Sequence, residues 1–183
     1  MRIIAGQWRG RKLSFPDAQG LRPTSDRIRE TLFNWLQPGL PGARCLDLFA
    51  GSGALGFEAA SRGAAQVVMV EHVQAVVRAL QENARQLSAS SLQIARQDAV
   101  DFLATVSEPF DVVFLDPPFS DTTLLMQAIA ALSVPGRLKE GARVYIETPS
   151  RDAEPAVPGG WRQEKYKKAG QVAYRLYRFT TTG

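Results

Sequence analysis

The 183-residue sequence contains a single cysteine, Cys45, and a single histidine, His72. A lone cysteine excludes a disulfide framework within the chain and a cysteine-based zinc site. No stretch approaches the roughly 18 apolar residues of a membrane-spanning helix. Residues 1–6 also lack the long apolar stretch of a secretory signal. These absences predict a cytoplasmic protein that does not associate with a membrane.

Positive charge is concentrated at both ends of the chain, although the net charge is only +4. Residues 1–44 contain eight Lys and Arg against three acidic residues, and residues 161–183 contain six against one. The middle of the chain, residues 45–160, holds eight basic and fourteen acidic residues. A basic surface supplied by both ends would attract nucleic acid, whereas the acidic middle would suit a small cationic ligand.

Short apolar runs alternate with helical patterns from residue 45 onwards. Buried strands are predicted at 45–48, 67–70, 92–95, 112–116 and 142–147, and helices after the glycine loop and at 73–87, 99–106 and 121–133. This alternation implies right-handed crossovers, and therefore an α/β fold with a doubly wound, mostly parallel sheet. Residues 161–168 and 171–180 predict an antiparallel C-terminal hairpin, which brings the sheet to seven strands.

The first 37 residues predict a small basic extension. Residues 2–5 and 11–15 should form a β-hairpin with Trp8 exposed, followed by a helix that Ser25 or Thr24 caps. The helix has an apolar stripe of Ile28, Leu32, Phe33 and Leu36 and ends at Pro38. Its other face should carry Arg27 and Arg29.

The four residues Asp116-Pro117-Pro118-Phe119 directly follow an apolar strand pattern. Two consecutive prolines remove two backbone donors and hold the chain extended, so that no helix begins there. A carboxylate, backbone carbonyls and an aromatic ring at a strand's carboxyl end suit a flat ring that bears an amine. The alternative is a tight turn in which the aspartate caps a helix and the phenylalanine is core.

A glycine-rich loop, residues 47–56, follows the first strand of the main domain. Gly51, Gly53 and Gly56 match the dinucleotide fingerprint, and Glu71 lies twenty residues after Gly51. A nicotinamide-dependent oxidoreductase is therefore a competing prediction. Asp47 argues against it, because a carboxylate would repel a pyrophosphate and attract an ammonium group.

Acidic residues close four successive predicted strands, namely Asp47, Glu71, Asp98 and Asp116. One bound molecule could meet the first with an amino acid, the second with ribose hydroxyls and the third with an adenine amine. S-adenosylmethionine has these parts in this order, and its net positive charge suits the acidic middle. We therefore expect S-adenosylmethionine as the cofactor, held by Asp47, Phe49, Gly51, Gly53, Glu71, Asp98 and Ala99.

These ordered motifs resemble those of class I S-adenosylmethionine-dependent methyltransferases, which have a Rossmann-like fold. Asp116–Phe119 resembles the (Asp/Asn/Ser)-Pro-Pro-(Tyr/Phe) signature of members that methylate nitrogens of planar systems. A closer resemblance, spanning roughly residues 2–180, is to the bacterial 16S ribosomal RNA guanine-N2 methyltransferase family. It is carried upstream by Arg2–Gly6, Arg9–Arg11, Arg22–Thr24, Arg27, Arg29-Glu30, Leu32–Leu36 and Ser61–Ala64.

The resemblance implies methyl transfer to a guanine exocyclic amine of 16S ribosomal RNA, in the small ribosomal subunit or its assembly intermediate. Asp116, Pro117 and Phe119 would be catalytic, and no metal would be needed. Residues 38–183 would form the cofactor-binding catalytic domain of a monomer, and residues 1–37 its basic extension. The residues expected to hold RNA are Arg2, Arg9, Arg11, Lys12, Arg22, Arg27, Lys165 and Lys167.

Other functions share parts of this pattern. A DNA adenine methyltransferase would use the same type of Asp-Pro-Pro-Phe site, but the chain shows no extra target-recognition segment. A protein-glutamine methyltransferase would leave the two basic ends harder to explain. A non-catalytic RNA-binding module would leave Asp116 without a role.

Overall fold

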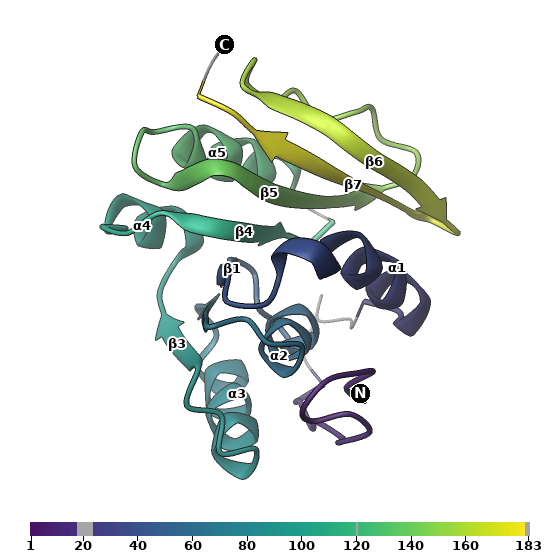
Figure 1. Cartoon of the computed structure of the whole chain (residues 1–183), viewed down its shortest axis with the longest axis vertical. Helices are drawn as coiled ribbons and strands as arrows, with labels where there is room; N and C mark the ends of the chain where they lie inside the picture. Colours follow the sequence, from purple (N-terminus) through teal and green to yellow (C-terminus); the bar gives the residue numbers. More distant parts are fainter. Residues whose placement is uncertain (18–23, 120, 182–183) are drawn as a thin grey trace.

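The computed structural model describes residues 1–17, 24–119 and 121–181. Its centre is a seven-stranded sheet in the order β3-β2-β1-β4-β5-β7-β6 (Figure 1). The strands are β1 (Arg44–Asp47), β2 (Gln66–Glu71), β3 (Leu92–Arg96), β4 (Phe110–Leu115), β5 (Leu138–Pro149), β6 (Trp161–Ala169) and β7 (Val172–Phe179). Strands β1 to β5 pair in parallel, and β7 pairs antiparallel with both β5 and β6. The predicted fold is thus confirmed, with its antiparallel C-terminal hairpin.

Helices cover both faces of the sheet, because successive residues of a buried strand point to opposite faces. Cys45, Met69 and Phe114 share one core with α1 (Asp26–Leu36), α2 (Ala54–Ser61) and α3 (Gln74–Gln86). Leu46, Val70 and Leu115, their neighbours in the chain, lie in the second core, with α4 (Ala99–Ala104) and α5 (Thr122–Leu132). A short 3₁₀ turn, η1 (Gln37–Gly39), follows α1. Within the residues placed by the structure, no helix is long and apolar enough to cross a membrane.

The order of the strands creates a switch point at β1. The chain moves from β1 outward to β2 and β3, and then returns to β4 on the other side of β1. Crossovers therefore leave β1 in opposite directions, which opens a crevice at the carboxyl ends of β1 and β4. This is where the sequence places the glycine loop and Asp116.

Residues 1–13 reverse direction as predicted, but their pairing is shorter than a hairpin. Arg2 and Lys12 form one isolated antiparallel bridge, and the Ile3 and Leu13 amides donate to Arg11 and Met1 carbonyls at 3.0 and 2.8 Å. Other backbone amides of this segment form hydrogen bonds with a side chain of α2. The Ile4 and Ala5 amides donate to the Glu58 carboxylate at 2.9 and 3.1 Å.

Two predictions about this extension are wrong. Trp8 is buried, not exposed, because its ring joins the core between the first residues and the α1–α3 layer. Arg29 is also buried, and it pairs with Asp26 at 2.6 Å and with Glu58 at 3.2 Å. It lies three residues before Leu32 on α1 and so shares the buried face. The predicted Ser25 cap and the apolar stripe of α1 are confirmed.

Candidate active site

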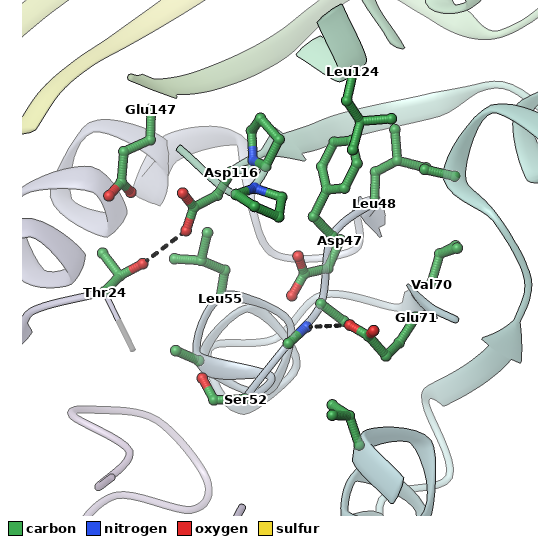
Figure 2. Close-up of a pocket in the computed structure, with 18 of the residues that line it drawn as sticks. Thr24, Asp47, Leu48, Ser52, Leu55, Val70, Glu71, Asp116, Leu124 and Glu147 are labelled. Carbon is green, nitrogen blue, oxygen red and sulfur yellow. Dashed lines mark hydrogen bonds between the residues drawn. The ribbon is translucent and has the colours of Figure 1, made fainter. Parts of the chain in front are cut away.

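A cavity of about 790 Å³ opens at the carboxyl ends of the parallel strands (Figure 2). All four acids of the predicted row line it, together with Pro117, Phe119, Phe49, Gly51 and Ala99. Gly53 is not part of the lining. It caps α2 with a φ of +81°, and a Cβ there would come within 2.6 Å of the Phe57 ring. The cavity therefore joins the predicted cofactor residues and the predicted catalytic residues in one space.

Asp116 follows the last residue of β4 and lies beside the start of α1. Its Oδ2 accepts a hydrogen bond from the Thr24 hydroxyl at 3.2 Å. The cap of α5 is Asp121, whose Oδ1 accepts from the Leu124 amide at 3.0 Å. The alternative in which Asp116 serves as a helix cap is therefore wrong. Its carboxylate and Phe119 both line the cavity.

Asp47 lies at the end of β1 and is only 2% exposed. Its Oδ2 accepts from the Gly56 amide of α2 at 2.9 Å, so it does brace the loop. A side chain at Gly56 would meet Met69 and this carboxylate at about 3 Å. Burial raises the pKa of Asp47 to about 7, the Gly56 hydrogen bond opposes the rise, and nearby Glu71 adds to it. A cation in the cavity would relieve that cost.

Glu71 holds the glycine loop from the end of β2. Its Oε2 accepts from the Gly51 amide at 3.1 Å (Figure 2). Its Oε1 accepts from the His72 and Val73 amides at 3.2 Å. Gly51 has a φ of +52°, a conformation that glycine adopts without a Cβ penalty. Glu71 thus fixes the path of the loop while it lines the cavity.

Asp98 is the N-cap of α4 at the end of β3. Its Oδ1 accepts from the amides of Val100 and Asp101 at 3.0 and 3.4 Å. Ala99 is buried beneath it, and Phe49 is partly buried against the core of the α4–α5 face. All three residues line the cavity.

Sequence reasoning missed Thr24 and Glu147 as lining residues. Glu147 is 3% exposed and accepts at Oε2 from the Tyr145 hydroxyl at 2.8 Å. A signal for it existed, because Glu147 closes the fifth predicted strand as the other acids close the first four. The predicted row of acids stopped at the fourth strand.

None of the predicted RNA-binding side chains that the structure describes lines the cavity. Seven of them are exposed, on the first residues, on α1 and on β6, namely Arg2, Arg9, Arg11, Lys12, Arg27, Lys165 and Lys167. Arg22, the eighth, lies outside the described residues. The first residues, α1 and the β6–β7 turn lie along the same side of the molecule, on the right in Figure 1. Since β6 is an edge strand, its lysines also discourage pairing with another sheet.

Comparison with known proteins gives a consistent set of relatives. The family described as "Conserved hypothetical protein 95" matches residues 1–178. The chain is 49% identical over its full length to the Ribosomal RNA small subunit methyltransferase D of Escherichia coli K12, covering 92% of it. It is also 49% identical to the Haemophilus influenzae protein of that name, with 97% of this chain and 93% of that protein covered.

Solved structures of methyltransferases are also similar to this chain. A structure described as the putative methyltransferase yhhF from Escherichia coli is similar with a TM-score of 0.93 and 46% identity, covering 100% of this chain and 99% of that one. An RNA methyltransferase from Salinibacter ruber, in complex with S-adenosyl-L-homocysteine, shares the fold with a TM-score of 0.63 at 17% identity, covering 88% and 96%.

Proposed function

The chain belongs to the family described as Conserved hypothetical protein 95, and from that membership we propose that it is a small-subunit ribosomal RNA methyltransferase. It transfers a methyl group from S-adenosylmethionine to the exocyclic amine of a guanine in 16S ribosomal RNA. The observation that carries this function is the single cavity that Asp47, Glu71 and Asp98 share with Asp116–Phe119. A methyl donor and a planar amine would meet there.

The residues of the cavity fit S-adenosylmethionine. Asp47 would receive the ammonium group, Glu71 the ribose hydroxyls and Asp98 the adenine amine, with Phe49, Gly51 and Ala99 around them. The raised pKa of Asp47 supports this assignment, because a buried carboxylate gains most from a neighbouring cation. When bound, the cofactor supplies an electrophilic methyl group.

The chain's own residues would then orient the base. The guanine amine is a poor nucleophile because its lone pair is delocalised into the ring. Hydrogen bonds to the Asp116 carboxylate and the Pro117 carbonyl would favour a pyramidal nitrogen with its lone pair directed at the methyl group, while Phe119 stacks on the base. Catalysis is then mainly positioning, and the base must be unpaired or flipped out of its stack.

The proposed partner is 16S ribosomal RNA within the small subunit or its assembly intermediate, in the cytoplasm. Residues 1–37 would act as an RNA-binding extension of a monomeric catalytic domain, residues 38–183. The exposed basic residues on the first residues, on α1 and on β6 support this arrangement. Thr24 and Ala169, which border the cavity, come from these two basic parts of the chain.

The oxidoreductase alternative is not favoured. Its pyrophosphate would approach the start of α2, where the Asp47 carboxylate already accepts the Gly56 amide. The DNA adenine and protein-glutamine alternatives are not favoured by the full-length relatives, whose names specify ribosomal RNA.

The direct test offers labelled S-adenosylmethionine with unmodified small subunits, free 16S ribosomal RNA and DNA. We expect label in the RNA of the first or second substrate, on N2 of a guanine, when the modified base is mapped by mass spectrometry. Label on DNA or protein alone would contradict the proposal.

Cofactor binding should release a proton below neutral pH. The folded pKa of Asp47, about 7, lies above the ordinary aspartate value of 3.8, so the empty protein favours the protonated acid and loses stability as the pH rises toward 7. An ammonium group beside Asp47 reverses that preference. Affinity should therefore rise between about pH 5 and pH 7 and level off above. Calorimetry in two buffers of different ionisation enthalpy measures the released proton.

The matched control for this measurement is Asp47→Asn, which should bind the cofactor more weakly and with no pH dependence over the same range. An affinity of the unaltered protein that is flat with pH would refute the placement of the ammonium group at Asp47.

RNA binding should weaken steeply with salt. Replacing Lys165 and Lys167 with glutamine should reduce the slope of log affinity against log salt by about one for each phosphate that the lysines neutralise. Lys139→Gln is the control. This lysine lies 3.0 Å from the Asp111 carboxylate, and neither residue lines the cavity. If the slope of the double variant is unchanged, Lys165 and Lys167 do not contact RNA phosphates and serve only to discourage pairing of β6 with another sheet.

A further inference from the structure

The Glu147 carboxylate lines the cavity from β5, next to β4, the strand that Asp116 directly follows. The last parallel pair between β4 and β5 joins Leu115 to Ile146, so Asp116 and Glu147 are the next residues in register. Both line the cavity, and Figure 2 shows their side chains next to one another above Thr24. Two carboxylates therefore face the same part of the cavity.

A hydrogen bond from Tyr145 fixes the orientation of the Glu147 carboxylate. The tyrosine is fully buried between Phe114 and Tyr174, with ring centroids 6.3 and 6.4 Å away. Its hydroxyl donates to Glu147 Oε2 at 2.8 Å. Burial, together with the charges of Glu147 and Asp116, raises the pKa of Tyr145 well above its usual value, so the hydroxyl remains a donor. Glu147 is thereby held in place as an acceptor.

The bases that carry an exocyclic amine differ in the ring nitrogen beside it. Of the two ring nitrogens beside the guanine amine, N1 carries a hydrogen, whereas in adenine and cytosine the one ring nitrogen beside the amine carries a lone pair. An oriented carboxylate accepts a hydrogen bond from the first and repels the second. Asp116–Phe119 alone does not make this distinction, because every such amine offers the same two hydrogens.

We propose that Glu147 is the residue that selects guanine, by accepting the N1 hydrogen while Asp116 and the Pro117 carbonyl accept the N2 hydrogens. This inference rests on the proposed function and adds to it the group that reads the base. Discrimination of this kind is strong, because a base without the N1 hydrogen would turn a lone pair toward the oriented carboxylate and be repelled.

The unaltered enzyme provides a first test with 2-aminopurine. This base keeps the N2 amine but carries a lone pair at N1. Small subunits are reconstituted with guanine or 2-aminopurine at the mapped position. We expect kcat/KM for 2-aminopurine to be lower by about a hundredfold or more.

The variant Glu147→Gln separates the N1 contact from the loss of the guanine O6 atom. The Tyr145 hydroxyl still donates to the glutamine carbonyl, so that the amide hydrogens face the base and suit an N1 lone pair. The preference for guanine over 2-aminopurine should fall by about a hundredfold, with the rate on 2-aminopurine rising. Tyr145→Phe should shift the preference in the same direction by less.

Three controls make the outcome decisive. Glu108→Gln, the same substitution at an exposed acid, should change nothing, cofactor affinity should be the same in all variants, and thermal unfolding should show that each variant is folded at the assay temperature. Equal losses on both bases, or an unaltered enzyme that accepts 2-aminopurine as readily as guanine, would overturn the role of Glu147. An enzyme that methylates no guanine would overturn the proposed function itself. If Glu147→Gln does not fold, the comparison of bases with the unaltered enzyme decides.

Discussion

Replacing Asp116 with alanine is expected to lower the rate of methyl transfer by about a thousandfold or more. The substitution removes the carboxylate that would accept a guanine N2 hydrogen, while the glycine loop and its contact with Glu71 remain. Cofactor affinity, measured by calorimetry, should therefore stay within a few fold of the original. Turnover is measured with labelled cofactor on small subunits.

Two further variants sharpen this test. Asp116→Asn keeps one acceptor oxygen and should retain more activity than alanine. Asp101→Ala removes an exposed carboxylate from the same edge of the sheet and should leave activity unchanged. Near-normal turnover in Asp116→Ala, or the joint loss of turnover and cofactor binding, would be incompatible with the assigned role.

Replacing Glu58 with alanine should lower the free energy of unfolding by about 3–5 kcal/mol, because it strands a buried charge. Glu58 is fully buried on α2 and accepts from the Ile4 and Ala5 amides and from Arg29 and Arg62. Denaturant titration measures the loss. Amide hydrogen exchange should show the first residues opening before the sheet.

The appropriate comparison is Glu82→Ala, which removes an acid from an exposed ion pair with Arg85 and should change stability little. Equal stability losses in the two variants would show that Glu58 does not hold the first residues in place. If stability falls but exchange at Ile4 and Ala5 does not become faster, the stabilisation comes from the ion pairs of Glu58 and not from its contacts with these two amides.

Much of the site could be predicted because parallel strands bring their carboxyl ends to one edge. Apolar runs give the strands, and the residue after each run is then a neighbour of the others. On this basis the sequence predicts that Asp47, Glu71, Asp98 and Asp116 surround one cavity, and the structure confirms that placement. The roles assigned to these acids remain predictions.

The two wrong predictions concern side chains whose burial depends on partners far away in the sequence. Helical periodicity places Arg29 on the buried face of α1, but its charge suggested exposure, and Glu58 lies 29 residues away in the chain. Trp8 is buried because Ser61 satisfies its amide at 2.9 Å and brings the segment against α2. No local pattern reveals such contacts. The choice of guanine likewise rests on resemblance to a family, and the proposed contact with Glu147 would give it a physical reason.

Helix α2 connects the glycine loop to the basic first residues of the chain. Gly53 begins it beside the cofactor loop, and Glu58 and Ser61, at its other end, hold the basic first residues. All eight residues of the helix are buried, so it has little freedom to bend or rotate. The spacing between the proposed cofactor loop and the proposed RNA-binding residues is then set by about two turns of one helix. A shift of this helix would move both together, which preserves their alignment while the surrounding structure fluctuates.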